Sequence, residues 1–301
     1  NHCECCLMDK AFPELDRRHF DVVVIGGGIN GASAAQNCAA AGYSCLLVEK
    51  SDYATGATGR SSRMLHVGLR YFDAQNPVRH YMSKPSRLFS AIRMARRATR
   101  EVSEFLRDTP ERVPRYKMVC PVYKGDATKD WHVRLGLRIL DGLGDGQHSL
   151  DIKRVTKNFS NSIPLAKYLR NENEIVSIHT YNEYKFDWPE RFCLNMITDA
   201  RRKGAITQNY CSAKLVSRDA ENNWTVQLSD SERPGAAPAT VTASRVLNMA
   251  GHWIDDVYEG PTKPRRHIQG TKGTNIAVRL PEEFAAHLEI LELVEAGAGR
   301  R

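Results

Sequence analysis

The most regular feature of the hydrophobic pattern lies near the start of the chain, over residues 20 to 50. Val22–Ile25 is a short run of β-branched apolar residues, as expected of a parallel strand that is buried on both faces. Ala32–Ala41 is rich in small helix-forming residues, and Gly42 follows at the position where helices commonly end. Cys45–Val48 is a second apolar run. The pattern predicts a strand–turn–helix–strand unit around a parallel sheet.

Helices and strands alternate along the rest of the chain. Apolar residues at helical spacing predict helices over 79–107, with a break near Pro85, and over Trp131–Leu143. Asp187 is the expected N-cap of a further helix, with Pro189 in its first turn. Strands are expected at Ala205–Gln208, Ala213–Ser217, Trp224–Leu228 and Thr240–Asn248, and the signals within 151–185 suit an antiparallel sheet. The predicted fold class is α/β.

Three glycines follow the first strand with the spacing G-x-G-x-x-G, at Gly26, Gly28 and Gly31. They permit a tight turn, a close approach of the backbone to a diphosphate, and close packing of helix on strand. The helix N-terminus then offers free N–H groups to the diphosphate. Glu49, at the end of the second strand, can accept hydrogen bonds from both ribose hydroxyls of an adenosine. This favours FAD or NAD over NADP, and a turn without a ligand is the alternative.

A loop rich in glycine, serine and threonine follows Glu49, and it runs into Leu65–Tyr71. Its N–H and hydroxyl groups can donate to phosphate and ribitol oxygens. The second part brings a base, an arginine and a phenol together, at His66, Arg70 and Tyr71. A flexible linker is the alternative interpretation, although a linker seldom runs into such a segment.

Two stretches, GGGINGA at 26–32 and GATGRSSRMLHVGLRY at 56–71, resemble the N-terminal half of FAD-dependent glycerol-3-phosphate dehydrogenases and related oxidases of the D-amino-acid-oxidase-like group. Further matches are VRLGLRILDGLG at 133–144, LNMAGHW at 247–253 and GTKGT at 270–274. The resemblance implies a Rossmann-like FAD-binding domain with a parallel sheet, plus part of a mostly antiparallel substrate-binding domain. The expected FAD-binding domain is 19–155 with 188–255, after a tail at 1–18, and the partial substrate-binding domain is 156–187 with 256–301.

The resemblance also implies which residues hold FAD. They are Gly26, Gly27, Gly28, Ile29, Asn30, Gly31, Glu49, Lys50, Thr58, Ser61, Ser62, Arg63, Leu65, His66, Ala213, Ala250 and Gly251. Met249 stands where the family usually has alanine or threonine, so this turn departs from the family pattern.

Oxidation of a secondary alcohol needs an anion grip, a base for the hydroxyl proton and an aimed carbinol hydrogen. His66 is the expected base because imidazole titrates near neutral pH. Arg70 can grip a substrate phosphate, and Tyr71 can add a hydrogen bond. Lys272 matches a family lysine near the substrate, although a solvated loop lysine explains it equally well. No metal site is expected.

A net charge of +8 and an isoelectric point near 9.1 indicate an anionic partner. Signatures of nucleic-acid-binding folds are missing, so a polyol phosphate or an acidic membrane surface is expected instead. The helix over 79–107 carries clustered arginines that suit such a surface, or simply a solvated face. Without a signal-peptide pattern, the expected location is cytoplasmic, in contact with the inner face of the membrane. Cys3, Cys5 and Cys6 are expected in a disordered tail rather than a metal site.

Three functions remain open at this point. The first is FAD-dependent oxidation of glycerol 3-phosphate to dihydroxyacetone phosphate with a quinone as acceptor. Relatives that act on erythritol phosphate, or that use oxygen, would look nearly the same over this length. The second is a non-catalytic FAD-binding remnant, because the family pattern fades after about residue 284. The third, an NAD-dependent dehydrogenase, leaves the 56–71 stretch unexplained.

Overall fold

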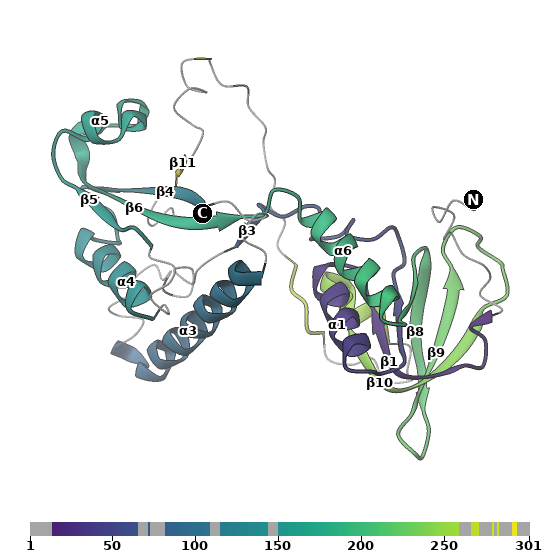
Figure 1. Cartoon of the computed structure of the whole chain (residues 1–301). Coiled ribbons are helices and arrows are strands. Elements are labelled where there is room, and N and C mark those ends of the chain that lie inside the picture. The colour runs from purple at the N-terminus through teal and green to yellow at the C-terminus, as the bar shows by residue number, and fades with distance from the viewer. Residues whose placement is uncertain are drawn as a thin grey trace. The chain divides into compact units, whose positions relative to one another are not determined.

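The structure is a computed structural model, and it describes residues 14–65, 72, 82–108, 115–143, 150–258, 266–270, 279, 282 and 291–293. The chain forms two compact units (Figure 1). The first comprises Asn1–Ser62 and Trp188–Thr274, and the second comprises Arg63–Asp187 and Asn275–Arg301. Each unit is described by itself.

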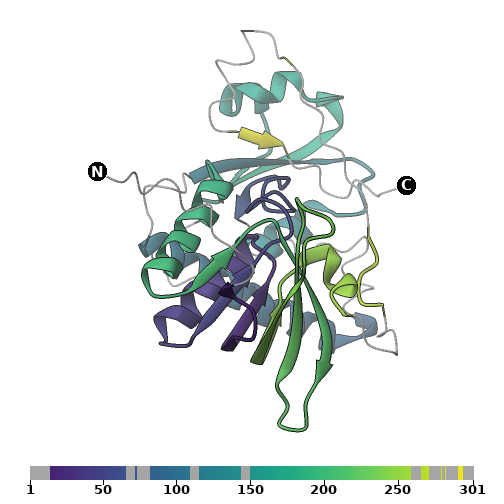
Figure 2. The same cartoon turned by 90° about the vertical axis from the view of Figure 1, so that its right-hand side faces the viewer.

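The first unit is a six-stranded sheet in the order β7-β2-β1-β10-β9-β8. Its strands are β1 (His19–Ile25), β2 (Cys45–Val48), β7 (Ile206–Gln208), β8 (Cys211–Arg218), β9 (Trp224–Asp230) and β10 (Ala239–Asn248). Neighbouring strands are parallel among the first four in this order, which are β7, β2, β1 and β10. The last two pairs, β10 with β9 and β9 with β8, are antiparallel, and Figure 2 shows β8 and β9 as a long hairpin.

The side chains of β1 alternate between two cores, as the period-2 geometry of a strand requires. Val22 and Val24 face the helices α1 (Ile29–Ala40) and α6 (Pro189–Arg202), which lie side by side in Figure 1. Val23 and Ile25 face the opposite core, which includes apolar residues of β8, β9 and β10. Burial on both faces explains why this strand is an unbroken apolar run in the sequence.

The mixed parallel and antiparallel sheets confirm the predicted α/β class. The four strands expected after residue 204 all form, with bounds shifted by at most two residues. The N-cap prediction for α6 was wrong, because the N-cap is Trp188 rather than Asp187. The fixed φ of Pro189 suits the first helical position, so the residue directly before it becomes the cap.

The second unit is built on strands β4 (Arg115–Tyr123) and β6 (Ile175–Lys185), which pair antiparallel. The sheet order is β11-β4-β6-β3, with β5 (Lys153–Val155) also paired to β6. The outer strands are β3 (Met64–Leu65) and β11 (Leu291–Leu293). Short helical segments at Phe159–Ser162 (α5), Pro164–Tyr168 and Glu172–Glu174 occupy much of the interval in which strand signals were sparse.

Helices α3 (Pro85–Asp108) and α4 (Asp130–Leu143) pack on this unit. Met82 and Ser83 are helical, Lys84 is not, and helix α3 begins at Pro85, so the expected break near Pro85 is confirmed. A proline in the first turn loses no hydrogen bond that the helix would otherwise make. No helix within the described ranges combines the length and the apolar character that a bilayer crossing requires.

The compact units do not coincide with the expected division into domains. Residues 63–155 belong to the second unit, because β4 pairs along its length with β6 and α3 and α4 pack in the same core. The expected division placed this segment with the FAD-binding domain, since it precedes the substrate-domain strand signals in the sequence. Strand pairing with a partner some 60 residues later was not visible in the local pattern.

A polar cluster, buried at Ser177 and His179, fixes the start of α4 to the second sheet. Asp130 Oδ1 accepts hydrogen bonds from Ser177 Oγ at 2.6 Å and from His179 Nε2 at 2.9 Å. Both Asp130 oxygens also accept from the Arg154 guanidinium at 2.9 Å. The Arg154 contact in particular holds the pKa of Asp130 well below its usual range. His179 is fully buried, and its Nδ1 has no partner among the described residues.

We expect this cluster to make the second unit sensitive to acid. Burial lowers the pKa of His179, with Arg154 and Arg134 adding to the effect and Asp130 opposing it. His179 therefore becomes protonated near pH 6.5 in the unfolded chain, but stays neutral at that pH in the folded chain. Stability should be constant above about pH 7 and fall below it, by up to about 1.4 kcal/mol per pH unit.

Urea unfolding of the full chain from pH 7.5 to 5.5 would measure this slope, and His179→Gln should reduce it. A slope remains in that variant, because burial also lowers the pKa of His132. The control is His19→Gln, since the ring of His19 is exposed. Equal slopes in the wild type and in His179→Gln would show that folding does not lower the pKa of His179.

Candidate functional site

The glycine turn joins β1 to α1 at the carboxyl edge of the parallel sheet. Gly26 has φ +114°, which side-chain-bearing residues rarely adopt, and its N–H donates to Val48 O at 2.8 Å. A Cβ on Gly31 would lie 1.8 Å from Gly26 O. The first and third glycines of the motif therefore hold the helix directly against the strand end.

The N-terminus of α1 faces out of this turn without a charged cap. No acidic residue occupies its first turn, and the N-cap residue is Gly28, which has no side chain that could cap the helix. Ile29 N donates to Thr58 Oγ1 at 3.0 Å, and the helical ladder starts with Ala32 N to Gly28 O at 2.9 Å. The N–H groups of Asn30 and Gly31 precede the ladder, so helix geometry leaves them to a ligand.

Glu49 lies next to the turn, at the end of β2. Its Oε2 accepts from Gly27 N at 2.7 Å, and its Oε1 accepts from Ser51 N at 2.9 Å. A carboxylate has about four acceptor positions, so each oxygen keeps one for a ribose hydroxyl. The two backbone contacts orient the carboxylate beside the turn, and they also show that Gly27 N is not a phosphate donor here.

Contacts to Gly27 that the sequence did not predict also hold the turn in place. Gly27 O accepts from Ala54 N at 3.0 Å and from the Cys193 thiol at 3.4 Å. Burial raises the pKa of Cys193 to about 12, so the thiol stays protonated and can donate. The ring of Tyr53 lies where a side chain on Gly27 would have to go. A lone cysteine in α6 gives no sequence signal for this contact.

The end of β10 lies beside the glycine turn, as its parallel pairing with β1 requires. Met249 N donates to Ile25 O at 2.8 Å, and a Cβ on Gly26 would meet Met249 O at 2.5 Å. Gly251 has φ +60° at the start of a short 3-10 helix, Gly251–Asp256. The departure from the family at Met249 is accommodated because its side chain packs against the α1 core.

Most of the other residues predicted to hold FAD lie in the first unit, and Arg63 and Leu65 lie in the second. Thr58 is buried and Ser61 Oγ donates to Thr58 O at 3.3 Å, while Ser62 is exposed. Lys50 Nζ lies 3.5 Å from the centre of the Trp253 ring.

Ala213 packs into the core that Val23 faces, so only its backbone is open to a ligand. Arg63 and Leu65 belong to the second unit, where Arg63 O accepts from Phe186 N at 2.8 Å and Leu65 pairs with Tyr184.

The predicted catalytic residues His66, Arg70, Tyr71 and Lys272 lie outside the described residues, as do Cys3, Cys5 and Cys6. Their roles stay predictions. Among the residues that the structure does describe, no group of three or more histidine, cysteine, aspartate or glutamate side chains is placed to hold a metal ion.

The donor set at this edge fits the ADP half of a dinucleotide. It combines orphan amides at a helix N-terminus, the Thr58 hydroxyl above them and an oriented carboxylate on the neighbouring strand. Gly31 lies so close to Gly26 that neither position can carry a side chain, and no side chain from the turn therefore blocks a diphosphate.

Comparison with known proteins agrees with this geometry. A glycerol-3-phosphate dehydrogenase of Synechocystis is 27% identical over 280 residues, covering 89% of this chain and 47% of that protein. D-erythritol 1-phosphate dehydrogenase of Brucella abortus is 29% identical over 266 residues, covering 86% of this chain and 47% of that protein. The chain thus spans about half the length of the curated relatives it matches.

Solved structures share the fold. Glycerol-3-phosphate dehydrogenase of Bacillus halodurans, complexed with FAD, superposes with a TM-score of 0.51 at 23% identity, covering 81% of this chain and 37% of that one. L-α-glycerophosphate oxidase of Mycoplasma pneumoniae, with FAD bound, has a TM-score of 0.54 at 17% identity, covering 79% and 56%. The model of the family described as FAD dependent oxidoreductase matches residues 21–297. The chain therefore belongs to the DAO family of FAD-dependent oxidoreductases, and its cofactor is FAD.

Proposed function

We propose that the protein containing this chain oxidises glycerol 3-phosphate, or a similar polyol phosphate, at its secondary alcohol. The observation that carries the proposal is the oriented Glu49 beside the open N-terminus of α1, in a chain whose relatives are named as polyol-phosphate dehydrogenases. The first feature accounts for the cofactor and the second for the class of substrate. The chain spans about half of those relatives, so membership of the family does not by itself determine the activity.

In this proposal the described residues hold the ADP half of FAD. The amides of Asn30 and Gly31 and the Thr58 hydroxyl donate to diphosphate oxygens, and Glu49 accepts from the ribose. Thr58 Oγ1 already accepts from Ile29 N, so its own hydrogen is available to a phosphate oxygen. Lys50, Ser61, Ser62, Ala213, Ala250 and Gly251, all of the first unit, complete the proposed set, and the roles predicted for Arg63 and Leu65 of the second unit stay predictions.

The chemical step in this proposal rests on the 56–71 stretch. Bound FAD supplies the two-electron acceptor for the hydride that leaves the carbinol carbon. His66 takes the hydroxyl proton, and this makes hydride departure easier because negative charge builds on the oxygen. Arg70 and Tyr71 hold the substrate phosphate, and Lys272 adds positive charge near the alkoxide or the phosphate. We further propose that the electrons pass to a membrane quinone.

Anaerobic spectroscopy tests the proposal. The chain is purified, reconstituted with FAD and mixed with glycerol 3-phosphate or D-erythritol 1-phosphate in separate experiments without oxygen. Bleaching of the flavin bands by either substrate supports the proposal, and the faster one identifies the polyol. Erythritol phosphate is a specific second candidate because one relative carries that activity. Bound flavin that neither substrate bleaches would contradict the proposed activity of this chain.

Replacing Thr58 by valine should weaken FAD binding about tenfold. The change removes a hydroxyl donor to the charged diphosphate, which costs about 1–2 kcal/mol of binding free energy. The Thr58 hydroxyl also accepts from Ile29 N at 3.0 Å, which holds it beside the helix N-terminus. Fluorescence titration of the chain with FAD measures the dissociation constant.

Thr58→Ser keeps the hydroxyl and is the matched control, with binding expected within about twofold of wild type. If valine and serine variants bound FAD equally well, the Thr58 hydroxyl would have no part in the site.

A further inference from the structure

A cation–π contact joins the segment after β2 to the segment after β10. Lys50 Nζ lies 3.5 Å from the centre of the Trp253 ring, well within the range of about 6 Å over which an indole face attracts an ammonium group. Lys50 follows Glu49 at the end of β2, and Trp253 lies in the 3-10 helix after β10. Because β1 lies between β2 and β10 in the sheet, the contact bridges the carboxyl end of β1, where the glycine turn starts.

The Trp253 ring is held in place by its own surroundings. Its backbone N–H donates to Ala250 O at 3.0 Å, and the ring lies close to Gly56, where a Cβ would be 3.6 Å from it. The centre of the His252 ring lies 3.4 Å from the centre of the Trp253 ring. With these neighbours the indole offers Lys50 a fixed face.

Lys50 itself depends on this contact for its position. Its side chain is exposed, and an exposed lysine ordinarily samples many rotamers in water. The structure gives Lys50 no carboxylate partner among the residues it describes. Both oxygens of the neighbouring Glu49 accept instead from backbone N–H groups, those of Gly27 and Ser51. The contact with Trp253 is therefore what orders the ammonium group.

We propose that Trp253 is a positioning residue of the cofactor site, because it holds the Lys50 ammonium group at the edge where the diphosphate of FAD binds. The other donors proposed for this edge are backbone amides and the Thr58 hydroxyl, which carry partial charges. A full positive charge beside them strengthens the binding of an anion. Trp253 acts through Lys50 and needs no contact of its own with FAD. The inference concerns the cofactor and does not depend on which polyol phosphate is oxidised.

Fluorescence titration of the full chain with FAD tests this proposal through a double-mutant cycle. Lys50→Gln should weaken FAD binding about tenfold, because it removes a charged donor to the diphosphate. Trp253→Leu should weaken it about fivefold, since the ammonium group loses the indole face that holds it. The double variant should bind FAD no more weakly than Lys50→Gln alone, as expected of two residues that act as a pair.

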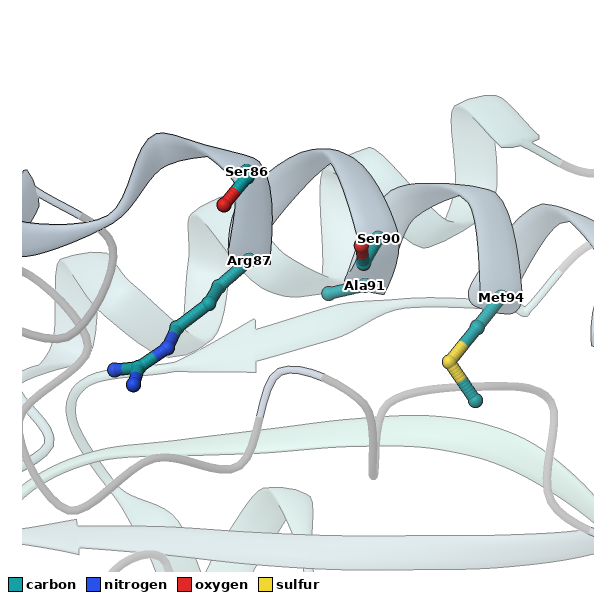
Figure 3. Close-up of a pocket in the computed structure, with 5 residues that line it drawn as sticks. All are labelled: Ser86, Arg87, Ser90, Ala91 and Met94. Atoms are coloured by element: carbon teal, nitrogen blue, oxygen red, sulfur yellow. The ribbon is translucent and has the colours of Figure 1, made fainter.

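Two control variants account for the lost charge and the lost contact. Arg218→Gln removes a cation that lies 5.2 Å from the centre of the Trp224 ring, in the hairpin of β8 and β9. Arg87→Gln removes a cation of α3 in the second unit, where Figure 3 shows it beside a hollow whose described lining residues all belong to that helix. Both controls should bind FAD within about twofold of the wild type.

Trp253→Phe keeps an aromatic face for Lys50 and should restore binding to within about twofold of the wild type. A double variant in which the two losses multiply, to about 50-fold, would overturn the proposal, because Trp253 would then act independently of Lys50. Wild-type affinity in Lys50→Gln would also overturn it. That variant is decisive even where circular dichroism shows Trp253→Leu to be unfolded, since Lys50 is exposed. Equal losses in Lys50→Gln and Arg87→Gln would attribute the effect to net charge and reject the proposal. Flavin bleaching by polyol phosphates, measured separately, reports on the proposed function alone.

Discussion

Replacing His66 by alanine should slow flavin reduction by glycerol 3-phosphate about 10²–10⁴-fold while FAD stays bound, the range for loss of a general base. In the proposed reaction the imidazole accepts the hydroxyl proton as the hydride leaves. Without it the proton must pass to water, and the alkoxide character that helps hydride departure is lost. Stopped-flow absorbance under anaerobic conditions measures the rate, and the visible spectrum before mixing reports bound flavin.

The control for this variant is His19→Ala. His19 begins β1, and its ring bonds to Thr242 and Ser244. Parallel strands bind ligands at their carboxyl ends, so this histidine is at the wrong edge of the sheet to act in the reaction. Wild-type bleaching in His66→Ala would remove His66 as the base. Recovery of the rate at high pH, in contrast, is expected if hydroxide can replace it.

Replacing Gly31 by alanine should have the opposite signature, with loss of FAD binding itself. The added Cβ would lie 1.8 Å from Gly26 O, which is backbone and cannot rotate away. Strand end and helix must therefore separate, which costs about 3 kcal/mol and displaces the amides that receive the diphosphate. We expect FAD affinity to fall about 100-fold, as measured by fluorescence titration.

Gly142→Ala is the matched control, because a Cβ at that position of α4 would meet nothing within 4 Å. Far-ultraviolet circular dichroism separates a local displacement from failure to fold. If Gly31→Ala folded and bound FAD with wild-type affinity, the close packing of α1 on the turn would not be needed for the cofactor.

The two variants together divide the proposed site into parts. Gly31 belongs to the first unit and to the ADP half of the cofactor site, whereas His66 belongs to the stretch that distinguishes this chain from other dinucleotide-binding proteins. A cofactor defect without a chemical defect, and the reverse, would show that binding and catalysis depend on different segments. The same defect in both variants would contradict that separation.

Local patterns were sufficient to predict the cofactor unit. The apolar run at Val22–Ile25, the glycine spacing and the acid at Glu49 each depend on residues that are close in sequence, and the structure confirms the strand, the helix and the second strand. The four later strands followed equally from alternation and turn residues. A resemblance in two short stretches was enough to predict the family that the comparisons show.

Contacts between distant segments were not predictable in this way. Cys193 reaches Gly27 O because α6 packs against α1, and Ala54 reaches it from the turn segment after β2. Neither residue stands out in the sequence. The Asp130 cluster joins residues 47 and 49 positions apart, at the junction of α4 with β6. Local propensity contains no information about which helix will cover which strand.

The sequence by itself determined the nucleotide edge of this protein, because a turn, a helix start and a strand end are made from consecutive residues. Tertiary structure decided which residues contact Gly27 O and hold the turn in place, and which segments form each compact unit. It also decided that Phe89 is exposed among arginines, whereas Ala95, six residues further along the same helix, is buried. The physical reason is that burial and long-range pairing depend on partners that only the folded chain brings together.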